Sequence, residues 1–135
     1  MLTIFTDGGS RGNPGPAAIG YLIYRHADII QQDKKFIGLQ TNNYAEYHAL
    51  IEALNYCINN NLVGEEIKCY LDSQLVVNQL NGIYKVKDQN IKIHYQTLQT
   101  LLKNFKNISF THIPRANNKE ADKLVNEALD AINNN

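Results

Sequence analysis

Residues 2–16 have the sequence Leu-Thr-Ile-Phe-Thr-Asp-Gly-Gly-Ser-Arg-Gly-Asn-Pro-Gly-Pro, and we expect the fold to be organised around them. Side chains alternate over residues 2–7, and this period of two predicts a β-strand. The strand carries Asp7 to its end, and the glycines that follow can take positive φ and allow another backbone to approach closely. This arrangement suits a bound cation or phosphate, and it equally suits the turn of a β-hairpin.

The composition is that of one globular domain, residues 1–135. A chain of 135 residues with 44% hydrophobic residues can bury roughly two-thirds of its unfolded surface. It has no apolar run of ~18 residues, and Thr3 and Asp7 interrupt its N-terminal apolar residues, so we expect neither a transmembrane helix nor a signal peptide. Cys57 and Cys69 lack the spacing of metal ligands and are expected to be buried free thiols in the reducing cytoplasm.

The formal net charge is zero, with 13 basic and 13 acidic residues. Domains that bind nucleic acid are usually basic, so this balance argues superficially against such a partner. The argument weakens if several acids gather in one site. Setting aside Asp7, Glu46, Asp72 and Asp122 leaves nine acidic residues against 13 basic ones, and the remaining surface would carry a charge of +4.

Hydrophobic periodicity divides the rest of the chain into strands and helices. After the first strand we expect strands at 17–24 and 29–38, a helix at 41–59, a strand at 67–71, helices at 75–80 and 90–105, a strand at 108–113, a helix at 119–132 and a disordered tail at 133–135. This order predicts an α/β fold with a five-stranded mixed sheet, an antiparallel three-strand meander plus two parallel strands, flanked by helices. The first and fourth strands should be parallel neighbours at its centre.

Glu46 lies on the apolar stripe of the helix at 41–59. The stripe consists of Ala49, Leu50, Ala53, Leu54 and Cys57. A carboxylate on the buried face of a helix is costly unless it is paired or bound to a metal. The alternative is a capping box in which Asn43 caps the helix and Glu46 follows three residues later.

Two further carboxylates stand at positions where ligands often bind. Asp72 follows the strand at 67–71 and repeats the placement of Asp7, and the carboxyl ends of strands are where α/β sheets bind ligands. Asp72 is also explained as a helix N-cap. Asp122 lies in the first turn of the last helix, where favourable interaction with the helix dipole is an alternative explanation.

If the four carboxylates converge, they cannot all remain ionised without help. Divalent cations are the natural remedy, and oxygen ligands without His or Cys favour Mg²⁺ or Mn²⁺ over zinc. Two such ions roughly 4 Å apart are suited to in-line displacement at phosphorus. If the carboxylates converge, the site would thus suit divalent cations and the chemistry that such ions assist.

The sequence resembles type 1 ribonuclease H over nearly its whole length. The resemblance rests on blocks in the right order, namely Thr6-Asp7-Gly8-Gly9 with Gly12-Asn13-Pro14-Gly15-Pro16, Thr41-Asn42-Asn43-Tyr44-Ala45-Glu46, Asp72-Ser73-Gln74, and Asn117 through Ala121-Asp122 to Leu124. It implies a ribonuclease H-like fold and an endoribonuclease that cuts the RNA strand of RNA·DNA hybrids, leaving 5′-phosphate and 3′-hydroxyl ends.

The resemblance also implies roles for the carboxylates. Two Mg²⁺ ions, with Mn²⁺ as a substitute, would occupy the site. Asp7 would bridge both ions, and Asp122 would complete the site that holds the attacking water. Glu46 and Asp72 would hold the second ion, which stabilises the leaving 3′-oxygen.

The same resemblance implies contacts to the hybrid duplex. The implied substrate-binding residues are Gly8, Asn13, Thr41, Asn42, Asn43 and Gln74. The asparagines and Gln74 match positions that touch the minor groove, where the 2′-hydroxyl distinguishes hybrids from DNA. Thr41 and Asn13 match a pocket that grips a phosphate of the DNA strand. Such contacts position the duplex without reading its sequence.

The chain departs from many members of the family in two places. Residues 82–92 form a short connector without Trp, and Lys85, Lys87 and Lys92 are the bases that remain of a basic protrusion. The loop before Asp122 is compact. His112 stands at the distance of a mobile histidine that helps product leave, but Arg115 is the other candidate and the one we favour.

Two alternatives remain open for function. One is a broader duplex nuclease that also cuts double-stranded RNA, and the other is a nucleic-acid-binding module with weak catalysis. We expect a cytoplasmic monomer with no membrane association and no obligate protein partner.

Overall fold

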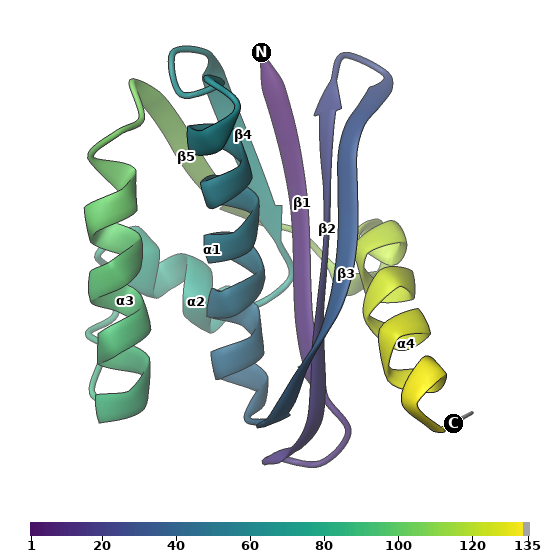
Figure 1. Cartoon of the computed structure of the whole chain (residues 1–135). Coiled ribbons are helices and arrows are strands. Elements are labelled where there is room, and N and C mark those ends of the chain that lie inside the picture. Colours follow the sequence, from purple (N-terminus) through teal and green to yellow (C-terminus); the bar gives the residue numbers. More distant parts are fainter. Residues whose placement is uncertain (134–135) are drawn as a thin grey trace.

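The strand β1 (Leu2–Ser10) lies at the centre of the sheet and pairs on both sides. It is antiparallel to β2 (Gly15–Arg25) and parallel to β4 (Glu66–Leu71). The edge strands β3 (Asp28–Gln40) and β5 (Asn107–His112) complete the order β3-β2-β1-β4-β5. The computed structural model describes residues 1–133 (Figure 1). The predicted five-stranded mixed sheet, with its meander and its central parallel pair, is confirmed.

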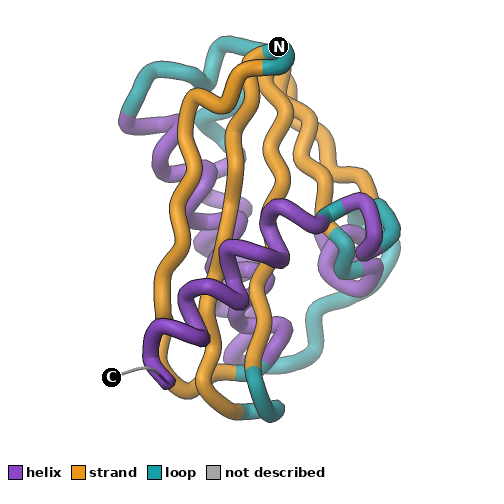
Figure 2. The backbone as a smooth tube through the Cα atoms, turned by 90° about the vertical axis from the view of Figure 1, so that its right-hand side faces the viewer, coloured by secondary structure: helices purple, strands orange, loops and turns teal. Residues whose placement is uncertain are grey.

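Helices cover both faces of this sheet. Three helices, α1 (Asn42–Asn59), α2 (Gln74–Leu80) and α3 (Gln89–Leu102), lie on one side, and α4 (Lys119–Asn133) lies on the other (Figure 1). Figure 2 shows α4 running obliquely across the strands. Of the tail expected at 133–135, Asn133 is the last residue of α4, and residues 134–135 lie outside the described part of the chain.

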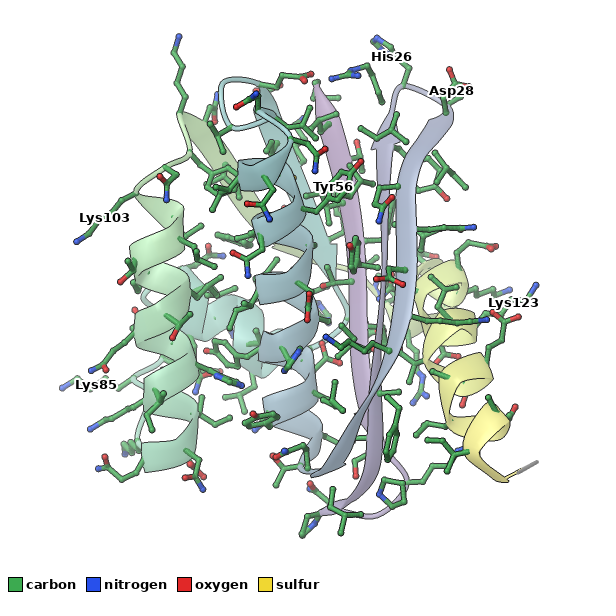
Figure 3. The ribbon with its side chains drawn as sticks, viewed as in Figure 1. His26, Asp28, Tyr56, Lys85, Lys103 and Lys123 are labelled. Carbon is green, nitrogen blue, oxygen red and sulfur yellow. The ribbon has the colours of Figure 1, made fainter. Side chains whose placement is uncertain are left out.

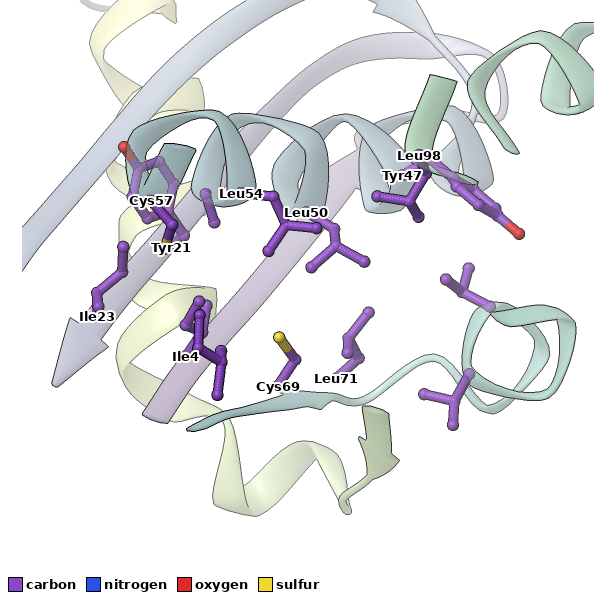
Figure 4. Packing of buried hydrophobic residues seen from close by; sticks show 14 of the residues in the cluster. Ile4, Tyr21, Ile23, Tyr47, Leu50, Leu54, Cys57, Cys69, Leu71 and Leu98 are labelled. Atoms are coloured by element: carbon purple, nitrogen blue, oxygen red, sulfur yellow. The ribbon is translucent and has the colours of Figure 1, made fainter. Parts of the chain in front are cut away.

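The core forms between α1 and the two parallel strands. Ile4 of β1 and Cys69 of β4 are fully buried and face Leu50 and Leu54 of α1 (Figure 4). The whole predicted stripe of α1 is buried. Burial of each large aliphatic side chain contributes roughly 1.5–3 kcal/mol. This packing fixes α1 over the centre of the sheet.

Two glycines allow helices to approach the sheet closely. A Cβ on Gly8 would lie 2.2 Å from the carbonyl carbon of Ala45 in α1. A Cβ on Gly20 would lie 2.6 Å from the Cβ of Leu124 in α4. Neither position tolerates a side chain without movement of a helix. The glycines thus determine how near α1 and α4 come to β1 and β2.

The first strand is longer than predicted. It continues past Asp7 to Ser10 through antiparallel pairing with β2, whereas its parallel pairing with β4 ends at Thr6 opposite Leu71. Asp7 therefore lies at the end of the parallel pair rather than at the end of the strand. Among the glycines that follow Asp7 up to residue 15, only Gly12 has a positive φ, at 120°.

The labelled surface charges lie at the periphery of the molecule. In Figure 3, Lys85 and Lys103 point outward on the side of α3, and Lys123 points outward from α4. His26 and Asp28 mark the β2–β3 turn at the end of the hairpin. Within residues 1–133, no helix combines the length and the apolar character needed to cross a membrane.

Candidate active site

Three carboxylates meet where β1 and β4 stop pairing. Asp7, Glu46 and Asp72 each offer an oxygen, and these oxygens lie within 4.8 Å of one another. Asp7 is 7% exposed and Glu46 is 6% exposed, whereas Asp72 is partly open to solvent. The predicted convergence of these three residues from β1, α1 and the end of β4 is thus present in the structure.

The cluster is electrostatically unfavourable without a cation. Burial, followed by the charge of Asp72, raises the pKa of Asp7 from 3.8 to about 7. Burial, followed by the charge of Asp7, raises the pKa of Glu46 well above its ordinary value. Like charges in a site of low polarity favour protonation. The arrangement therefore either retains protons near neutral pH or binds a positive charge.

Glu46 reaches the site because α1 begins close to β1. Its Oε1 accepts a hydrogen bond of 3.4 Å from the backbone N–H of Gly8, and its Oε2 is buried without a partner. The capping-box alternative is wrong, because Thr41 is the N-cap and accepts a bond from the N–H of Tyr44. Glu46 is therefore free of capping and directed at Asp7.

Asp72 is held by a residue that the sequence did not single out. Nδ2 of Asn118 donates to Oδ2 of Asp72 at 3.1 Å and to the carbonyl of Thr6 at 2.8 Å. Asn118 is 1% exposed. The N-cap alternative for Asp72 is wrong as well, because Ser73 caps α2. Asn118 thus ties the loop before α4 to both central strands and orients Asp72.

Asp122 lines the same cavity but lies outside the group of three. The cavity, of about 420 Å³, contains the three clustered carboxylates, Asp122 and Arg115. Nη2 of Arg115 lies 3.4 Å from Oδ1 of Asp122. The ion pair is solvent-exposed on the arginine side, so it can exchange partners readily. Asp122 is within the field of the cluster, since its charge also raises the pKa of Asp7.

The residues predicted to contact substrate form a connected rim. The N–H of Ser10 donates to Oδ1 of Asn42 at 2.8 Å, and the N–H of Asn42 donates to Oδ1 of Asn13 at 3.1 Å. Gly8, Asn42 and Asn43 line the cavity of the carboxylates. The β1–β2 loop and the start of α1 are thereby fixed to each other beside the acidic cluster.

A second cavity, of about 360 Å³, adjoins this rim. Asn13, Thr41 and the first two residues of α1 line it, and these include both residues predicted to grip a phosphate. Asp88 lines it too, where its carboxylate caps α3 by accepting from the N–H groups of Asn90 and Ile91. The pocket therefore offers amide donors together with one negative charge, which weakens its attraction for a phosphate.

Two predicted residues line neither of these two cavities. His112 is the last residue of β5, exposed and paired with Leu71 in the sheet. Gln74 is the exposed first residue of α2, next to Ser73, which does line the cavity. Of the two candidates for assisting product release, Arg115 faces the carboxylates and His112 does not line their cavity.

The donor set fits a hard divalent cation. The three clustered side chains offer carboxylate oxygens, and Oε2 of Glu46 is a buried acceptor without a partner. Buried unsatisfied acceptors are rare unless a ligand completes them. Oxygen-only donors favour Mg²⁺ or Mn²⁺. The cluster is therefore a candidate metal centre.

The sheet order and the acidic cluster at its centre define the ribonuclease H-like class of fold. Residues 5–128 match the family described as reverse transcriptase-like. The crystal structure of LC11-RNase H1 in complex with RNA/DNA hybrid superposes with a TM-score of 0.92 at 41% identity, covering 98% of this chain and 99% of that one. The chain belongs to the type 1 ribonuclease H family.

Curated relatives agree with this assignment. Ribonuclease HI of Halobacterium salinarum is 43% identical over 127 residues, which are 93% of this chain and 63% of that protein. The bifunctional protein Rv2228c of Mycobacterium tuberculosis is 41% identical over 132 residues, which are 96% of this chain. The chain spans 36% of the length of the mycobacterial relative.

Proposed function

We propose that this chain is a metal-dependent endoribonuclease that hydrolyses the RNA strand of RNA·DNA hybrids and leaves 5′-phosphate and 3′-hydroxyl ends. The observation that carries the proposal is the group of Asp7, Glu46 and Asp72 within 4.8 Å of one another. Its family includes a ribonuclease H1 whose crystal structure holds an RNA/DNA hybrid. The buried, unpaired oxygen of Glu46 supports metal binding at this place.

The four carboxylates would together hold two Mg²⁺ or Mn²⁺ ions. Asp7, Glu46 and Asp72 would supply clustered oxygen ligands, and Asp122, which lines the same cavity, would supply a further one. Such ions supply a water nucleophile at neutral pH and neutralise charge on the leaving oxygen. The chain itself orients the ligands, since Asn118 holds Asp72 and the N–H of Gly8 holds Glu46.

Substrate recognition would use the rim beside the cluster. Asn13, Asn42, Asn43 and Gln74 offer amides to the minor groove of the hybrid, where 2′-hydroxyls are displayed. Thr41 and Asn13 line the adjoining cavity for a phosphate of the DNA strand. The carboxylate of Asp88 in that cavity opposes the phosphate, so we expect a loose grip on the DNA strand.

Arg115 is the better candidate for assisting product departure. It lines the carboxylate cavity, and a guanidinium can form two hydrogen bonds to a phosphate. We expect Arg115→Ala to lose roughly tenfold more kcat than His112→Ala, equivalent to about 1.4 kcal/mol of barrier. A larger loss in His112→Ala than in Arg115→Ala would assign the role to the histidine.

The activity test is cleavage of matched substrates in Mg²⁺ or Mn²⁺. We expect a continuous hybrid to be cut, DNA duplex to be left intact, and a duplex with a single ribonucleotide to be cut poorly. Asp7→Asn and Asp72→Asn should abolish cleavage with the circular dichroism spectrum unchanged, while Asp28→Asn at the β2–β3 turn should retain it. Wild-type turnover in either of the first two variants would contradict the metal assignment.

The same assay separates the alternative functions. Cleavage of RNA duplex at a rate similar to that of the hybrid would indicate the broader nuclease. Binding of hybrid without any cleavage would indicate a binding module.

We further propose a cytoplasmic monomer without an obligate protein partner, because one chain supplies every residue of the cluster and both cysteines are free. Size-exclusion chromatography of the active protein tests the oligomeric state.

A further inference from the structure

Arg11 lies at the edge of the carboxylate cavity and takes no part in the functions assigned above. It follows β1 in the loop to β2, and its side chain crosses to α4. There Nη2 donates to Oδ1 of Asp130 at 2.6 Å and to Oδ1 of Asn126 at 3.3 Å. Arg11 and Asn126 both line the cavity that contains the acidic cluster.

The position of Arg11 is built by the surrounding backbone. Its N–H donates to the carbonyl of Pro16 at 2.8 Å, which closes the loop. The neighbouring Ser10 is tied to α1 through Asn42. On α4, Nδ2 of Asn126 donates to the carbonyl of Asp122 at 3.1 Å, so the contact of Arg11 with α4 lies one turn from an active-site carboxylate. The backbone of Arg11 is therefore held in place, and its guanidinium meets α4 one turn from Asp122.

Few cationic side chains line the cavity of the carboxylates, although a polyanionic strand would need them there. The chain contains three arginines, and two of them, Arg11 and Arg115, line the cavity of the carboxylates. The third, Arg25, is paired with Glu65. Because a nucleic-acid strand crossing the cluster brings its own phosphates, cations beside the cluster are needed to offset the repulsion.

We propose that Arg11 binds a phosphate of the RNA strand next to the scissile one. The proposal rests on the ribonuclease activity proposed above and adds a contact for the cleaved strand at the α4 side of the cavity. A guanidinium presents a planar fork of donors that matches two phosphate oxygens. Arg115 lines the same cavity beside Asp122, so the two arginines offer separate cationic contacts to the strand.

Asp130 acts as a resident counter-ion for Arg11 that the phosphate replaces. The side chains of Arg11 and Asp130 are 38% and 61% exposed. Ion pairs this exposed contribute little to stability and are screened by salt. Exchange of the carboxylate for a phosphate therefore costs little, and the aspartate keeps the guanidinium in position until substrate arrives. The competing explanation is a purely structural link between the loop and α4.

The two explanations predict opposite behaviour for the two halves of the ion pair. If the ion pair were only a structural link, removing Arg11 or removing Asp130 would break the same contact and have the same effect. A phosphate ligand is lost in Arg11→Ala, whereas Asp130→Asn only removes a competitor and a negative charge near the strand. We therefore expect Arg11→Ala to weaken substrate binding and Asp130→Asn to leave it unchanged or strengthen it.

The experiment measures kcat and KM on a continuous RNA·DNA hybrid with Mg²⁺ at several salt concentrations between about 50 and 200 mM. Hybrid binding in EDTA is titrated over the same range. The variants are Arg11→Ala, Arg11→Lys and Asp130→Asn, each compared with wild type for thermal unfolding. We expect Arg11→Ala to raise KM roughly tenfold with kcat within about twofold, and to reduce the slope of log K against log salt by about 1. Arg11→Lys should keep the slope and recover part of the affinity.

An unchanged salt slope in Arg11→Ala would overturn the proposal, as would equal losses in Arg11→Ala and Asp130→Asn. Failure of the proposed function gives a different result. In that case wild type binds hybrid in EDTA without cutting it in Mg²⁺, and the salt slopes of binding still test Arg11.

Discussion

Asp7 lies on a buried strand beside two other carboxylates, so its ionisation opposes folding when no metal is bound. Its pKa is raised from 3.8 to about 7, chiefly by burial and then by Asp72. A raised carboxyl pKa means that the protonated form is favoured in the folded state. This contribution to stability is fully present below about pH 3.8 and is lost as the pH rises through about 7.

Asp7→Asn should therefore stabilise the metal-free protein, and more so at pH 8 than at pH 5. The pKa change corresponds to an upper bound of roughly 4 kcal/mol. We expect the free energy of unfolding to rise by about 2 kcal/mol at pH 8, because part of the repulsion is relieved by the raised pKa of Glu46. Urea unfolding in EDTA at both pH values measures it. Asp28→Asn, on the exposed β2–β3 turn, should change stability by less than about 0.5 kcal/mol. A loss of stability in Asp7→Asn at pH 8 would refute the prediction.

Asn118→Ala should reduce activity by misplacing Asp72. The variant removes the donor that holds Oδ2 of Asp72 and leaves the carbonyl of Thr6 without that partner. Loss of a residue that orients a metal ligand typically lowers metal affinity or activity by roughly 10–100-fold. A buried polar group left without a partner costs about 1–3 kcal/mol of stability. Mg²⁺-dependent kcat and urea unfolding measure the two effects. The matched control, the exposed neighbour Asn117→Ala, should show neither.

Sequence patterns located the cluster for physical reasons that apply residue by residue. Asp7 and Asp72 stand at the carboxyl ends of alternating runs, where α/β sheets bind ligands, and Glu46 interrupts an apolar helical stripe. Asn118 obeys no local pattern. Its partners lie 112 and 46 residues away, and only the folded chain brings them together.

At the scale of elements, the closeness of α4 to the sheet decides whether Asp122 reaches the site. Gly20→Ala would place a Cβ 2.6 Å from the Cβ of Leu124 and 2.8 Å from the carbonyl oxygen of Ala121. We expect α4 to shift, with a cost of about 1–3 kcal/mol from overpacking and a loss of kcat through Asp122. Gly64→Ala is the control, since no atom lies within 4 Å of its Cβ. Equal kcat in the two variants would show that α4 does not position Asp122.

Elements were predictable in kind and order, because each long segment has a clear period of two or of 3.6. Their ends were less so. Helix α1 is capped by Thr41 rather than Asn43, and β1 extends over Gly8 and Gly9. A cap depends on the dihedrals of one residue, and the extension of β1 depends on pairing with β2. Neither the cap nor the extension of β1 can be predicted from the hydrophobic pattern.

At the scale of the whole molecule, metal binding at the cluster would be coupled to folding. The carboxylates of Asp7, Glu46 and Asp72 come from β1, from α1 and from the end of β4, so they are brought together only when the sheet and its main covering helix have formed. A cation that binds this arrangement binds the folded state in preference to the unfolded chain. Such a ligand stabilises the fold by about 2.7 kcal/mol when its free concentration is 100 times its Kd.

Mg²⁺ should therefore raise the Tm of wild type in a concentration-dependent manner, by several degrees at saturation, and EDTA should reverse the rise. Asp7→Asn should begin from a higher Tm in EDTA, because repulsion is relieved, and should gain little from Mg²⁺, because the shared ligand is gone. NaCl at the same ionic strength is the control for general screening, which acts on exposed charges of both proteins alike. Calorimetric scans with and without metal provide the comparison. If NaCl and MgCl₂ raise the Tm of wild type equally, the cluster binds no specific cation. That result would contradict the metal-dependent activity proposed for this site.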